Sequence, residues 1–160
     1  MANCVTKQQL ITPHSTGRPG ALLSLRFVPG PASLRSLGGG PSGFLLDVWQ
    51  QFAVAEASDH RWRVASRMYE FRLLDHQERE LLVYHWQPTS EFRGQDHPHL
   101  HVSAALHAQV NAVTTRAYDL DKRHLATGNV SLATVVRMLI EEFGIAPLRA
   151  DWQQVLDQAT

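Results

Sequence analysis

Two alternating segments in the middle of the chain constrain the fold most strongly. In the first, residues 63–75 (RVASRMYEFRLLD), the apolar residues Tyr69, Phe71 and Leu73 alternate with mostly polar neighbours. Residues 81–86 (LLVYHW) continue the same two-residue period after a short polar break, DHQERE. Successive side chains of a strand point to opposite faces, and two such runs joined by a polar break are typical of a hairpin. The sequence therefore predicts an antiparallel β-hairpin over residues 63–86.

Residues near the C-terminus predict two helices. Ser131 is a good N-cap for a helix over 131–143, and Gly144 is a typical residue to end it. A short last helix is expected at 151–158, where Asp151 and Gln154 have the spacing of a capping box. The apolar stripe of the longer helix consists of Leu132, Val135, Val136, Leu139, Ile140 and Phe143. Such a stripe suits a helix that packs against a sheet or against a second copy of the chain.

The segment FLLDVWQQFAVAEA, residues 44–57, predicts a further helix. Leu45, Val48, Trp49 and Phe52 follow a helical spacing and place one apolar stripe on its surface. Together with the hairpin, these helices predict an α+β fold: a small antiparallel sheet of three or four strands packed against two or three helices.

The first part of the chain is rich in proline and glycine, as in TGRPG, VPGPAS and LGGGPSG. Proline and glycine at this density break helices and strands, so residues 1–43 are expected to form a loosely ordered arm with at most one short strand at 22–28. The single α+β domain is then expected at 44–160.

Composition excludes several classes of protein. Fifteen basic residues balance fifteen acidic ones, so any nucleic-acid role must depend on a local patch and not on the overall charge. Cys4 is the single cysteine, which excludes an intramolecular disulfide and a multi-cysteine zinc site. No apolar run reaches the roughly 20 residues of a membrane span, and the first residues do not resemble a signal peptide. A cytoplasmic protein without a membrane partner is expected.

The segment DHPHLHV, residues 96–102, carries histidines at alternate positions: His97, His99 and His101. In a strand these side chains share one face, where two neighbours can bind one metal ion but three on a straight strand cannot. A further ligand must therefore come from elsewhere, and His85 in the predicted hairpin is the first candidate. Other candidates are Asp96, Asp121 and His124. A set with a carboxylate favours iron, whereas an all-histidine set with an open position favours zinc or copper.

The same segment resembles the histidine triad signature, His-φ-His-φ-His-φ-φ with φ apolar. His97-Pro98-His99-Leu100-His101-Val102 has this spelling and follows Gly94-Gln95. If Gly94-Gln95 sets the register, the three positions fall on His99, His101 and Ser103. The resemblance covers about ten residues and implies nucleotidyl or phosphoryl transfer by attack of the middle histidine on phosphorus.

A longer pattern resembles the small TumE-type proteins, toxins of bacterial toxin–antitoxin pairs. It consists of the hairpin YEFRLLDHQERELLVYHW, then PHLHV, then a helix that opens with VSL, over roughly residues 65–143. The resemblance implies one α+β domain, a centre at His99 and His101, and an antitoxin partner. Where that family has Tyr-Asp-Asn after the second strand, this chain has Tyr84-His85-Trp86.

Three functional hypotheses follow from these residues. The first is a toxin–antitoxin component that hydrolyses RNA, with His99 and His101 as general base and acid and Arg93 or Arg67 holding the phosphate. The second is a metal-binding domain that uses His97, His99 or His101 with His85. The third is a noncatalytic interaction module, in which the histidines lie on an exposed edge strand. There Pro98 and the polar histidines would discourage edge-to-edge aggregation. The partner would be an antitoxin-like protein, RNA or a second copy of the chain.

Overall fold

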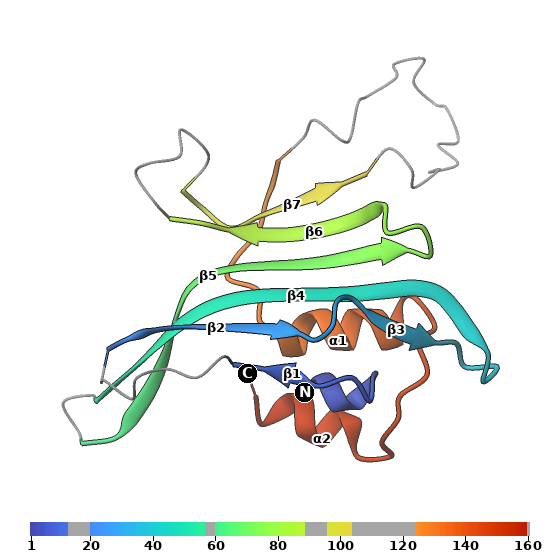
Figure 1. The fold of residues 1–160 in the computed structure, drawn as a ribbon, viewed down its shortest axis with the longest axis horizontal. Helices are drawn as coiled ribbons and strands as arrows, with labels where there is room; N and C mark the ends of the chain where they lie inside the picture. The colour runs from blue at the N-terminus through green and yellow to red at the C-terminus, as the bar shows by residue number, and fades with distance from the viewer. Residues whose placement is uncertain (13–19, 57–59, 89–95, 104–123, 160) are drawn as a thin grey trace.

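The structure is a computed structural model that describes residues 1–12, 20–56, 60–88, 96–103 and 124–159. These residues form one antiparallel sheet of eight strands, with two α-helices and a 3-10 helix (Figure 1). The strand order is β1-β2-β4-β5-β6-β7-β8, and β3 also pairs with β4. The register places β2 and β3 one after the other along the same edge of β4.

The bounds of the elements follow the chain order. The strands are β1 (Leu10–Ile11), β2 (Leu22–Phe27), β3 (Ala32–Arg35), β4 (Pro41–Glu56), β5 (Trp62–Asp75), β6 (Glu80–Trp86), β7 (His99–Val102) and β8 (Leu125–Ala126). The helices are the 3-10 helix η1 (Ala2–Cys4), α1 (Leu132–Glu141) and α2 (Trp152–Asp157).

The predicted hairpin is confirmed. β5 and β6 pair antiparallel with Phe71 opposite Tyr84. Asp75 closes the turn between them, because its Oδ1 accepts hydrogen bonds from the backbone N–H groups of Gln77 and Arg79 at 2.8 and 3.0 Å. The histidine segment contributes the next strand of the sheet, since β7 pairs antiparallel with β6.

One face of the sheet forms the core with α1. Phe71, at the centre of β5, is 1% exposed, and the core extends from it to Val136 and Leu139 of α1. Two tyrosines of this face also contact the α1 region: the Tyr69 hydroxyl accepts a hydrogen bond from the backbone N–H of Val130 at 3.0 Å, and the Tyr84 hydroxyl donates to the Met138 sulfur at 3.4 Å. Helix α1 is thus held to the sheet by apolar packing and by hydrogen bonds.

Both C-terminal helices form where the sequence predicts them. Ser131 caps α1, with its Oγ accepting from the backbone N–H of Thr134 at 3.1 Å, and Gly144 beyond the helix has a φ of 64°. The expected capping box of α2 does not form, because the Asp151 carboxylate binds the Arg149 guanidinium at 2.7 and 2.8 Å. Neither helix in the described part of the chain has the length that a bilayer crossing requires.

The prediction of a helix at 44–57 is wrong. Residues 44–56 lie in β4, and residue 57 lies outside the described residues. An apolar run of this kind fits a strand period as well as a helical one. Leu46 and Val48, two positions apart, are both fully buried against Leu73 and Phe71 of β5. Pairing along the whole length of β5 therefore decides the conformation of this segment.

The predicted α+β class with a small sheet and two or three helices is also wrong, because the protein is mostly antiparallel sheet with two short helices. The strand expected at 22–28 is confirmed as β2. The residues before 44 add further strands to the sheet, and Cys4, Val5 and Leu34 are buried in the core. The domain division placed after residue 43 accordingly falls inside β4.

A candidate metal site on the histidine face

The face of β5, β6 and β7 that points away from α1 carries most of the polar residues of these strands. We call it the histidine face. It is formed by the residues that alternate with the core positions: Glu70, Arg72, Val83, His85, His99 and His101. Because side chains alternate along each strand, the same three strands build the core on one face and this polar surface on the other.

The strand register brings histidines from β6 and β7 together. His85 lies directly opposite His99, and their ring centroids are 5.2 Å apart. His101 lies one alternation further along β7, with its ring 4.8 Å from His99 and 6.3 Å from His85. One potential ligand nitrogen from each ring lies within 4.8 Å of the other two. Nitrogens bound to one tetrahedral zinc ion are roughly 3.4 Å apart, so small side-chain rotations suffice to bind an ion.

His99 is the buried member of this three-histidine group, with 3% of its surface exposed. Its Nδ1 lies 2.8 Å from the backbone carbonyl oxygen of His97. A carbonyl oxygen accepts hydrogen bonds, so Nδ1 carries the proton and Nε2 keeps its lone pair. A histidine that binds a metal through one nitrogen commonly donates the other N–H to a carbonyl in this way.

The environment keeps two of the three imidazoles neutral. Burial lowers the pKa of His99, and the nearby His85, His124 and His97 lower it further against the opposing effect of the His97 carbonyl. Burial also lowers the pKa of His101, with added repulsion from the neighbouring histidines and an opposing attraction by Glu80. Neutral imidazole is the form that binds metal ions.

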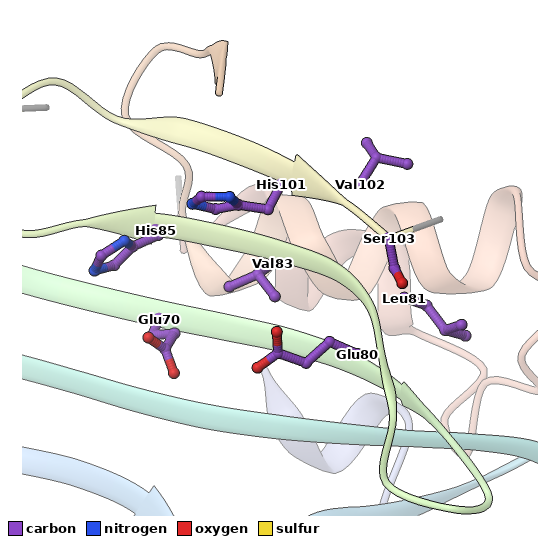
Figure 2. Close-up of a pocket in the computed structure, with 8 residues that line it drawn as sticks. All are labelled: Glu70, Glu80, Leu81, Val83, His85, His101, Val102 and Ser103. Carbon is purple, nitrogen blue, oxygen red and sulfur yellow. The ribbon is translucent and has the colours of Figure 1, made fainter. Parts of the chain in front are cut away.

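A pocket of about 270 Å³ opens beside the three-histidine group (Figure 2). Its lining residues are Glu70, Glu80, Leu81, Val83, His85, His101, Val102 and Ser103. Figure 2 shows His85 and His101 on neighbouring strands, with the two glutamates on the β5 side of them. The lining thus combines apolar side chains, two imidazoles and two carboxylates, and it contains no lysine or arginine among these described residues.

Arg72 holds the carboxylates of this surface in place. Its guanidinium hydrogen-bonds Asp47 of β4 through Nε at 3.1 Å and lies 3.3 Å from Glu70 and 3.6 Å from Glu80. Glu70 and Glu80 are not among the site residues predicted from the sequence. The alternation of Glu70 and Arg72 with core residues predicts that they lie on the polar face of the strand. Only the register between β5 and β6 shows that Glu70 lies opposite His85.

The other sequence candidates lie outside the three-histidine group. His97 precedes β7, is exposed, and has its ring 6.1 Å from that of His99 and its Nδ1 3.7 Å from Asp96. Arg67 of β5 is exposed and does not line the pocket. Arg93 and Asp121 lie outside the described residues. His124, which precedes β8, has its ring 4.9 Å from His99 and 4.4 Å from His101.

Comparisons with known proteins found no relative: no protein-family model matches the chain, and no curated protein or solved structure matches it. The resemblances to TumE-type toxins and to the histidine triad family stay predictions that rest on short motifs. The arrangement of the histidines is therefore the observation on which a functional proposal has to rest.

Proposed function

We propose that this protein binds a divalent transition metal ion, preferably zinc, through His85, His99 and His101. The observation that carries the proposal is the mutual approach of their ligand nitrogens to within 4.8 Å. Two adjacent, directly paired strands hold the residues, so the approach depends on the sheet and not on a loop. The ligands are in place before an ion binds, which lowers the entropic cost of binding.

The residue types favour zinc. Imidazole nitrogens suit zinc, copper, iron and nickel, whereas magnesium and calcium prefer oxygen ligands. The mononuclear iron sites considered from the sequence need a carboxylate beside two histidines. Asp96 is exposed and lies beside His97, and Glu70 and Glu80 of the pocket lining lie beside Arg72. Among the described residues, the group of ligand atoms that lie within 4.8 Å of one another contains no carboxylate. A set of three histidines is also the ligand set of known zinc sites in which a fourth position stays open to water or substrate.

The local chemistry of His99 and His101 supports the same proposal. His99 has one ring nitrogen fixed as a donor to the His97 carbonyl, which leaves the other free to bind an ion. His85 and His101 are half-buried and line the pocket, so an ion has a route to the three-histidine group. Binding would require no deprotonation of His99 and His101 near neutral pH, because burial lowers the pKa of both.

A metal-free ribonuclease of the toxin–antitoxin kind stays a prediction. His99 and His101 lie close enough to act on one substrate, with ring centroids 4.8 Å apart. General acid catalysis, however, needs one protonated imidazole, and the pKa is lowered for both. The two glutamates of the described pocket lining repel a polyanion such as RNA. These features favour metal binding over RNA hydrolysis, and the noncatalytic hypothesis predicts neither activity.

Elemental analysis of protein purified without a histidine tag tests the proposal. We expect about one equivalent of zinc in the wild type after zinc loading and dialysis, and none in a His99→Ala/His101→Ala variant. A His60→Ala/His76→Ala variant is the matched control, because it also loses two histidines but at exposed positions outside the three-histidine group. Circular dichroism checks that each variant is folded. A wild type without metal, or equal zinc in the first variant, would refute the proposal.

A further inference from the structure

A fourth imidazole, that of His124, reaches the three-histidine group from the other side of β7. His124 directly precedes β8, and the pairing of Leu125 with Leu100 and of Ala126 with His99 sets the position of this part of the chain. The ring of His124 lies 4.4 Å from that of His101 and 4.9 Å from that of His99. Three neighbouring strand segments thus deliver four histidines to one place on the histidine face.

We propose that His124 is the fourth ligand of the metal ion, so that four imidazoles complete its coordination. This inference rests on the proposed function. It makes the site a structural metal site, because a tetrahedral zinc ion with four protein ligands has no open position for water or substrate. The pocket beside the glutamates would then be a neighbour of the metal site and not the place where a substrate meets the ion.

The ring of His124 contacts two of the three histidines, His99 and His101. The ligand atoms that already lie within 4.8 Å of one another are those of His85, His99 and His101, so His124 would have to rotate toward them to bind the same ion. Rings that bind one tetrahedral zinc ion have centroids roughly 5 Å apart. The two contacts of His124, at 4.4 and 4.9 Å, are similar in length to the 5.2 and 4.8 Å contacts that His99 makes with His85 and His101. The two contacts of His124 thus resemble those within the three-histidine group.

A metal bond at His124 also fits the weak attachment of β8. This strand has two residues, both exposed, and Leu125 retains 45% of its surface. Apolar burial therefore contributes little to its hold on β7, although the backbone N–H of Thr127 donates to the Pro98 carbonyl at 2.9 Å. An ion shared by His85, His99, His101 and His124 would tie β6, β7 and the start of β8 together.

His97 provides a matched control in the same neighbourhood. Its ring lies 6.1 Å from His99 and its Nδ1 faces Asp96, whereas its backbone carbonyl accepts the hydrogen bond from His99. The substitution His97→Ala removes the imidazole but keeps that carbonyl. It should therefore leave the metal site intact, while His124→Ala removes one ligand.

X-ray absorption spectroscopy of the zinc-loaded proteins measures the coordination directly. We expect four imidazole nitrogens in the wild type and in His97→Ala, and three nitrogens with one oxygen from water in His124→Ala. Competition with a chelator should show zinc affinity at least about tenfold weaker in His124→Ala, since even outer partners of a ligand cost 10- to 100-fold. His124→Gln, which keeps a polar side chain at this exposed position, should behave in the same way.

The outcomes separate the two proposals. Three nitrogens and one oxygen in the wild type, with unchanged affinity in His124→Ala, would overturn the role of His124 and leave the three-histidine site in place. A wild type that takes up no zinc would overturn the three-histidine site, and the role of His124 with it. Loss of one nitrogen ligand in His97→Ala instead of His124→Ala would identify His97 as the fourth ligand and likewise overturn the inference.

Discussion

The two faces of β5 differ sharply although they share one backbone. On the core face, Phe71 and Leu73 are 1% and 2% exposed and pack toward α1. On the histidine face, the side chains of Glu70 and Arg72 retain 29% and 35% of their exposure and belong to the charged surface around the pocket. The comparison shows how a small sheet combines stability and chemistry: burial of one face sets the strand register, and the register positions the groups on the other.

This division implies that substitutions on the two faces have different consequences. Changes on the core face should lower the free energy of unfolding, because they remove buried apolar contacts. Changes on the histidine face should mainly alter charge and metal binding. Four predictions test the contrast.

The largest expected effect separates two adjacent residues of β5. Phe71→Ala should lower the free energy of unfolding by about 3–5 kcal/mol, because it leaves a cavity where the ring stacks on Tyr69 at 4.9 Å. Glu70→Ala, one position away on the histidine face, should cost less than about 1 kcal/mol. Urea denaturation of both variants measures the difference. Equal losses would contradict the division between the faces.

A hydrogen bond of the core face gives the next effect. Tyr69→Phe removes the acceptor of the Val130 N–H and should cost about 1–2 kcal/mol, because this donor precedes α1 and loses its partner. Tyr84→Phe is the matched control, since its hydroxyl donates to a thioether sulfur, a weak acceptor. Thermal unfolding should show a larger decrease in Tm for Tyr69→Phe. The opposite order would contradict this account of how α1 is held.

The ion pair of the histidine face should contribute less. Asp47→Asn removes a charge that binds Arg72, while Arg72 keeps Glu70 and Glu80 within 3.6 Å. We expect a loss of about 0.2–1 kcal/mol in urea denaturation, as for other partly exposed pairs. A loss comparable to that of Phe71→Ala would mean that the histidine face carries part of the fold's stability.

The smallest expected effect depends on pH and concerns the metal-free protein. Burial lowers the pKa of His99 and His101 below the ordinary value of about 6.5, so the unfolded chain binds more protons below that pH than the folded one. The stabilisation that this difference provides should therefore be complete above about pH 6.5. The free energy of unfolding should fall as the pH decreases below that value. Denaturation at several pH values should show a shallower fall for His99→Ala/His101→Ala. Identical slopes would show that these histidines titrate normally.

The sequence predicts best those elements whose local signals agree with their surroundings. β5, β6 and β7 follow a two-residue period with one polar face, and α1 has a serine N-cap and a glycine shortly after its C-terminus. β4 was mistaken for a helix because its apolar residues satisfy both periods over a short window. Its conformation is set by pairing with β5 on one edge and with β2 and β3 on the other, which no local pattern reports.

The site divides in the same way between sequence and structure. Alternation in the sequence determined that His99 and His101 share a face, and it identified His85 in the neighbouring strand as a partner. Only the tertiary structure decided that His85 lies opposite His99 and that His124 approaches from β8 while His97 lies apart. The physical reason is that a shift of one residue between β6 and β7 would turn the histidines to opposite faces, and long-range burial against α1 selects the register.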